Sequence, residues 1–170
     1  MTELSRHQEQ FKRVKRWYER FKNINNGKIH DKPSEFYEDE LYAFFMNCYH
    51  LKDWIINDPS TSSVANKVEG CINSNPDLKL CADLCNSLKH LCLNKKGHPP
   101  RSKEDPKFGT KSAIYNIAEN SIKFDYTIDT LSGHRSAFDI ATKCMEAWDK
   151  FFSDNKLNVT EEGFASSIIR

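Results

Sequence analysis

Apolar residues recur three and four positions apart along most of the chain, a spacing that gathers them on one face of an α-helix. These stripes predict helices over residues 4–26, 34–57, 62–73, 76–92 and 138–155. Two proline-containing pairs support the boundaries. Asp58-Pro59 ends the second helix, and Asn75-Pro76 supplies an N-cap followed by a proline in the first turn of the fourth. The pattern therefore predicts a bundle of four to five helices.

The pattern changes between the fourth and fifth helices. Residues 94–109 are rich in Lys and Pro and predict an exposed basic loop. Residues 110–129 then alternate apolar and polar side chains, with Phe124 and Tyr126 on one face, which predicts a β-hairpin. Because a lone hairpin is only marginally stable in water, we expect it to pack on the helices. The predicted fold is mainly α, of the α+β class, in a single domain over residues 1–170.

Composition narrows the class of protein. The 170 residues are 38% hydrophobic, 29% charged and 12% aromatic, which is too aromatic for a disordered chain and too charged for a membrane protein. No apolar run approaches the roughly 20 residues of a membrane span, and the first residues lack the apolar core of a secretory signal. We therefore expect a cytoplasmic protein with no membrane partner.

The chain has six cysteines and no CxxC motif. Most of them occupy apolar stripes, where a thiol packs as a small hydrophobic group, and a chain without a secretory signal is expected to keep its thiols reduced. We therefore predict no bound metal and no cofactor. Cys85 is the one thiol that we consider as a nucleophile, because Asn86 and His90 follow it on the same helix.

Polar side chains interrupt the apolar stripes of two predicted helices. Asp53 follows His50 by one turn on the second helix, and His90 follows Asn86 by one turn on the fourth. An imidazole oriented by a carboxylate is suited to acid–base chemistry near neutral pH. If the two helices are neighbours, these four side chains form a candidate catalytic group. The alternative is that they make polar contacts that only stabilise the bundle.

Basic residues follow the fourth helix closely. The net charge of the chain is only +1, but Lys89, Lys95, Lys96 and Arg101 lie together near the start of the predicted loop. Such a cluster is a candidate site for the phosphates of a nucleic acid. The alternative interpretation is an ordinary solvated loop.

The segment DLCNSLKH, residues 83–90, resembles the HEPN superfamily of small helical bundles from bacterial defence and toxin–antitoxin systems. That family's signature is an Arg followed four to six residues later by a His on one helix, often with a polar residue beside the Arg. Here His90 matches the histidine and Asn86 the polar residue, whereas no Arg occurs between Ala82 and Cys85. The resemblance implies RNA binding, or RNA cleavage by a dimer without a metal. The Arg that this sequence lacks is the cation that would stabilise developing phosphate charge.

Two functional hypotheses follow. The segments NCYHLKDW and LCNSLKH also resemble uncharacterised bacterial and mobile-element proteins, which favours an interaction protein, an accessory of defence or of a mobile element. The alternative is a HEPN-like RNA-binding protein or ribonuclease, with His90 as acid or base and Asn86 and His50 in positioning roles. The candidate partners are RNA, another protein and a second copy of the chain in a homodimer. Whether the chain is an enzyme is left open by its sequence.

Overall fold

The computed structural model describes residues 5–29, 31–89 and 100–157. Within these ranges the helices are α1 (Arg6–Asn26), α2 (Ser34–Asn57), α3 (Ala65–Ser74), α4 (Pro76–Lys89) and α5 (Ala137–Asp154), with a short 3-10 helix, η1 (Pro59–Thr61), after α2. The strands are β1 (Lys28–Ile29), β2 (Lys107–Asn116), β3 (Ser121–Thr130) and β4 (Gly133–Ser136). The predicted fold, mainly helical and of the α+β class, is confirmed.

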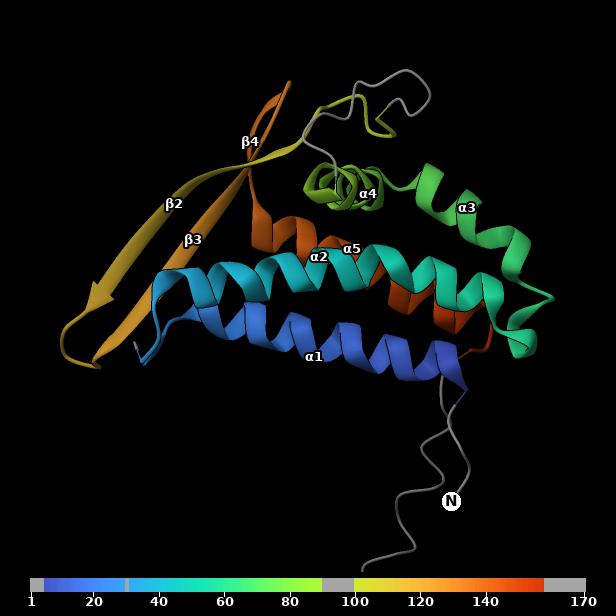
Figure 1. The fold of residues 1–170 in the computed structure, drawn as a ribbon, viewed down its shortest axis with the longest axis horizontal. Coiled ribbons are helices and arrows are strands. Elements are labelled where there is room, and N and C mark those ends of the chain that lie inside the picture. Colours follow the sequence, from blue (N-terminus) through green and yellow to red (C-terminus); the bar gives the residue numbers. More distant parts are fainter. Residues whose placement is uncertain (1–4, 30, 90–99, 158–170) are drawn as a thin grey trace, which may run out of the picture.

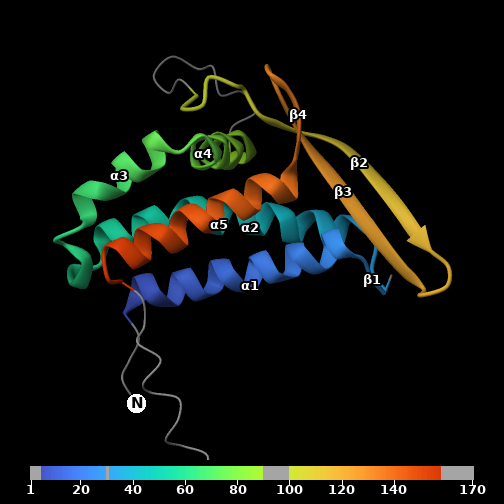
Figure 2. The same cartoon turned by 180° about the vertical axis from the view of Figure 1, so that it is seen from behind.

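Three long helices form the body of the molecule. α1 and α2 run antiparallel side by side, α5 packs behind them, and α4 crosses over α2 and α5 (Figures 1 and 2). The core between them is rich in aromatic side chains, among which Phe44, Phe45, Trp148 and Phe152 have no exposed surface. These are the residues that the apolar stripes place inward, so aromatic burial in the core is the main force that holds the helices together.

Local signals in the sequence set several helix ends. Asn75 caps α4 with its side-chain Oδ1, which accepts hydrogen bonds from the backbone N–H groups of Asp77 and Leu78, both at 2.9 Å. α1 ends at Gly27, whose φ of 90° lies in the left-handed region that favours glycine. These ends agree with the sequence-based boundaries within one or two residues.

The sheet is antiparallel, with β3 at its centre. β2 pairs with one edge of β3, while β1 and β4 pair with the other edge at opposite ends. Phe124, Tyr126 and Ile128 of β3 are buried against the helices, as their alternation predicts. The expected packing of the hairpin on the helices is therefore made mainly by β3.

β2 begins earlier than the sequence predicts. Residues 107–109, which we expected in the exposed loop, belong to this strand. Phe108 explains the difference, because its ring packs edge-on against Tyr42 and Phe45 of α2, with ring centroids 4.6 and 5.8 Å away. The described part of the loop is also less exposed than expected, since Pro106 is buried and Arg101 is half-buried. Tertiary contacts thus outweigh the local loop-like composition.

β1 and β4 are not predicted from the sequence. They contain two and four residues, which is too short for an alternating pattern to be recognised. Both form by pairing with β3, at Lys28↔Ile122 for β1 and Ile128↔Arg135 for β4. Among the described helices, none combines the length and the apolar character that crossing a bilayer requires.

Candidate functional site

His50 lies between α2 and α4 with both ring nitrogens near partners. Its Nδ1 is 3.1 Å from Oδ2 of Asp53, one turn along α2, and its Nε2 is 3.7 Å from Sγ of Cys85 on α4. The two helices are neighbours, as the sequence-based grouping requires. Because the ionised Asp53 carboxylate can only accept, Nδ1 carries the proton toward it, which leaves Nε2 as the basic nitrogen facing Cys85.

Cys85, His50 and Asp53 follow one another in the order of a catalytic Cys–His–Asp triad, but a substrate cannot reach the thiol. The His50 side chain is 32% exposed and the Asp53 side chain 48%, whereas Cys85 has no exposed surface. A nucleophilic thiol must meet its substrate, so the buried Cys85 acts as a packing partner for the imidazole. The exposed edge of His50 is the part of this group that a ligand can reach.

Of the remaining predicted site residues on and after α4, some are described by the structure and others are not. Asn86 is partly exposed on α4, next to Cys85. His90, Lys95 and Lys96 lie outside the described residues, as does the side chain of Lys89, the last residue of α4. The proposed pairing of His50 with His90 and the lysine cluster therefore stay predictions.

Arg101 anchors the described part of the basic loop onto the helices. Its Nη1 donates to Oε2 of Glu69 on α3 at 2.7 Å, and its backbone N–H donates to Oδ1 of Asp83 at 2.8 Å. The hydrogen bond with Glu69 raises the pKa of Arg101, and the same guanidinium holds the pKa of Glu69 below its usual range. A phosphate bound at Arg101 would therefore have to compete with Glu69.

Asp83 is satisfied by the loop and not by the imidazole group. It is buried on α4, and Oδ2 accepts hydrogen bonds from the backbone N–H and the hydroxyl of Ser102, at 2.7 and 2.5 Å. With the Arg101 bond it receives three donors, enough to compensate for the burial of a carboxylate. Its role is to fix the chain that leads into β2.

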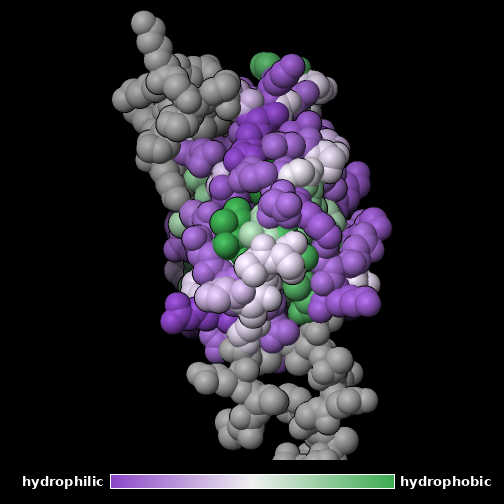
Figure 3. Space-filling view, turned by 90° about the vertical axis from the view of Figure 1, so that its right-hand side faces the viewer, coloured by the Kyte–Doolittle hydropathy of each residue, from purple (hydrophilic) through white to green (hydrophobic). Residues whose placement is uncertain are grey.

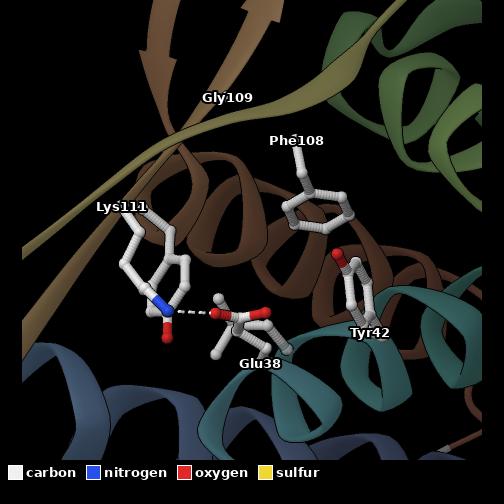
Figure 4. A pocket seen from close by; sticks show the side chains of 7 residues that line it. Glu38, Tyr42, Phe108, Gly109 and Lys111 are labelled. Carbon is white, nitrogen blue, oxygen red and sulfur yellow. Dashed lines mark hydrogen bonds and ion pairs between the residues drawn. The ribbon is translucent and has the colours of Figure 1, made fainter. Parts of the chain in front are cut away.

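A small cavity lies at the base of the hairpin, between α2 and the strands (Figure 4). Its volume is about 150 Å³. Lys111 of β2 and Glu38 of α2 form an ion pair at one side, and Tyr42 and Phe108 face each other at the other. Gly109 also lines it, and a Cβ atom there would collide with the Asp129 carboxylate. The cavity therefore marks where β2 is fastened to α2.

Beyond this base, β2 is an exposed edge. Among the described residues it pairs with β3 alone, and from Gly109 onward all of its residues are exposed. Ile114 and Tyr115 are 59% and 53% exposed, and Ile117, in the turn, is 84% exposed. This surface was not predicted from the sequence. The signal that could have found it is the uncharged run from Ser112 to Ala118, which is unusual for an edge strand.

Within the described part of the chain, side chains that could share a metal ion gather only at Cys48, Cys81 and Cys144, in the core. Those thiols lie on α2, α4 and α5, away from the exposed edge of β2. They are therefore separate from the surfaces described above.

Comparisons with known proteins identified no relative of this chain. A scan against protein-family models found no match, and searches of curated proteins and of solved structures found none either. The functional interpretation therefore depends on the geometry of the chain itself.

Proposed function

We propose that this chain is an interaction protein that assembles by strand addition at the free edge of β2, with a second copy of the chain as the partner. The observation that carries the proposal is the exposed, uncharged outer half of a ten-residue edge strand. A free edge presents unpaired backbone N–H and C=O groups, which are templates for another strand.

Edge strands usually carry features that prevent pairing with another chain, and only the first half of β2 carries them. A β-bulge between Phe108 and Lys111 and the cation of Lys111 protect its first half. From Ser112 to Ala118 there is no charge, no proline and no bulge. Ile114 and Ile117 are apolar and exposed at this edge, and a strand that pairs with the edge would cover them.

The same run favours a second copy as the covering strand. Two identical uncharged segments that pair antiparallel about a two-fold axis bring no like charges together. The end of the molecule away from the hairpin contrasts with it, since it presents mostly hydrophilic side chains around a small hydrophobic group (Figure 3). Pairing over about six residues buries a small interface, so the proposed association is weak and depends on concentration.

Sedimentation equilibrium from about 10 µM to about 1 mM tests this proposal. We expect the wild type to approach twice the mass of one chain, and Ile114→Lys, which adds a charge to the edge, to remain a monomer. Leu131→Lys is the matched control, because Leu131 is 79% exposed in the turn after β3 and changes charge equally. A wild type that stays monomeric throughout, or an Ile114→Lys variant that dimerises like the control, would contradict the proposal.

A second candidate function is metal-independent RNA cleavage of the HEPN-like kind. The observation that favours it is the imidazole of His50, which is oriented by Asp53 and partly open to solvent. In this hypothesis His50 and His90 exchange protons with the RNA, while the Lys and Arg side chains of the basic loop hold its phosphates.

RNA cleavage in the presence of a chelator separates this candidate from the first. We expect activity in the wild type and its loss in His50→Ala and His90→Ala. His134→Ala is the matched control, since His134 also pairs with a carboxylate, that of Asp129 at 2.6 Å, on the far side of β3 from β2. No cleavage by a folded wild type would exclude the nuclease hypothesis.

A further inference from the structure

Three buried cysteines from three helices converge in the core. Cys48 lies on α2, Cys81 on α4 and Cys144 on α5, and each is at most 1% exposed. Their sulfur atoms all lie within 4.8 Å of one another. Because the residues are far apart in the sequence, only the packing of α2, α4 and α5 brings the thiols together.

The spacing of the sulfurs is close to that around a thiolate-bound metal ion. A Zn–S bond of about 2.3 Å places the sulfurs of one ion about 3.8 Å apart in tetrahedral geometry and about 4.0 Å apart in trigonal geometry. Separations of at most 4.8 Å exceed these values by no more than about 1 Å, and rotation about χ1 moves a cysteine sulfur.

An unpaired donor lies beside the thiols. Trp148 of α5 is fully buried, and its indole N–H has no hydrogen-bond acceptor in the described part of the chain. The indole lies close enough to Cys48 to act on its thiol. Donors of this kind support the ligands of metal sites from outside the first layer.

Metal ions bind cysteine in its thiolate form, so an ion that enters this cluster would displace the protons of the thiols that it binds.

We infer that Cys48, Cys81 and Cys144 form a buried three-thiolate site for one thiophilic metal ion, of the class of Cu⁺ and Zn²⁺. Thiolates select these soft and borderline ions over hard ones such as Mg²⁺. Three thiolates complete the coordination of Cu⁺, whereas Zn²⁺ needs a fourth ligand, and no described His, Asp or Glu side chain joins the group. Such a site is separate from the interaction proposed at β2 and would stabilise the helix core.

Reconstitution of the reduced protein tests this inference. Full-length protein is loaded anaerobically with Cu⁺ or with Zn²⁺, and free ion is then removed. Metal per chain is measured by mass spectrometry, and thiolate-to-metal charge transfer by ultraviolet absorption. We expect about one ion per chain, and a rise in Tm of about 5–10 °C with metal at about 100 times its Kd. We expect Cu⁺ to bind more tightly than Zn²⁺.

Variants assign the bound ion to the cluster. Cys48→Ala, Cys81→Ala and Cys144→Ala should each lose it, while Cys71→Ala, which changes a described thiol outside the cluster, should keep it. A folded wild type that retains no ion, or cluster variants that retain as much as the wild type, would overturn the inference.

A variant that keeps every thiol guards against failure of the cysteine variants to fold. Trp148→Phe removes the indole N–H together with the five-membered ring, and it should weaken metal binding by about 10–100-fold. Charge-transfer absorption that saturates at one equivalent and is weakened in this variant supports the site. Absence of that absorption from the wild type contradicts it.

Discussion

His7 and Asp58 tie the start of α1 to the end of α2 at a single buried point. Both are less than a tenth exposed, and Oδ2 of Asp58 accepts hydrogen bonds from the backbone N–H and from Nδ1 of His7, at 3.1 and 2.9 Å. Its Oδ1 accepts two more from Ser60. A buried carboxylate with four donors is costly to disturb because each donor loses its partner at once.

Replacing this carboxylate should therefore destabilise the fold. We expect Asp58→Asn to lower the free energy of unfolding by about 2–4 kcal/mol at pH 7, measured by urea denaturation. Asp53→Asn is the matched control, since it breaks the partly exposed pair with His50 and should cost at most about 1 kcal/mol. Equal effects of the two variants would contradict the structural role of Asp58.

The same carboxylate gives stability a defined pH dependence. Burial raises the pKa of Asp58, but the hydrogen bonds from Ser60 and His7 outweigh it and hold the pKa far below its ordinary 3.8. A lowered folded-state pKa means that the contribution is complete above pH 3.8 and is lost as pH falls from there. The stability difference between the wild type and Asp58→Asn should therefore shrink below about pH 4, and urea melts at pH 5, 4 and 3 would show it.

For individual residues, the sequence predicts contacts within one helix better than contacts between two helices. His50 does pair with Asp53, and α2 and α4 do meet, but the side chain of α4 within reach of His50 is Cys85. Helical spacing fixes the face of one helix, whereas the rotation of its neighbour depends on packing of the whole core. The contact between His7 and Asp58 was missed for the same reason.

At the scale of elements, Asp83 shows how a helix side chain can organise a loop. The described part of the loop, residues 100–106, contains no helix or strand and leads directly into β2. The carboxylate of Asp83 supplies acceptors for the backbone N–H groups of Arg101 and Ser102. The direction in which β2 starts is therefore set from α4.

Removing that anchor should release the backbone of the loop. In Asp83→Ala we expect the amide hydrogens of Arg101 and Ser102 to exchange at least about tenfold faster, because each loses a charge-assisted hydrogen bond of more than about 1.4 kcal/mol. Glu69→Ala is the control, since it removes the partner of the Arg101 guanidinium and leaves both amide bonds in place. Hydrogen exchange read by NMR makes the comparison, and unchanged exchange in Asp83→Ala would refute the anchor.

Elements with strong periodicity were predictable and short ones were not. The long stripes of α1, α2 and α5 and the alternation of β3 each contain enough positions to identify their class. β1 and β4 form because each pairs with one end of the same edge of β3. β2 starts early because the ring of Phe108 packs against Tyr42. These features arise from contacts between elements, which no local pattern encodes.

At the scale of the whole molecule, the two ends of the helical body differ. At the hairpin end, an ion pair between Lys111 and Glu38 attaches the start of β2 to α2. The edge of β2 beyond this ion pair is uncharged. Pairing with β3 presents the edge in an extended conformation, which lowers the entropy cost of adding a strand. This is the physical basis of the proposed assembly through β2.

Backbone hydrogen exchange along β2 at two protein concentrations tests that assembly most directly. At about 1 mM we expect additional protection of outward-facing amides between Ser112 and Ile117, and we expect that protection to be lost at about 10 µM. The amides of β3 that are paired within the sheet should be protected equally at both concentrations. Identical exchange of the Ser112–Ile117 amides at the two concentrations would show that no second copy covers this edge and would contradict the account.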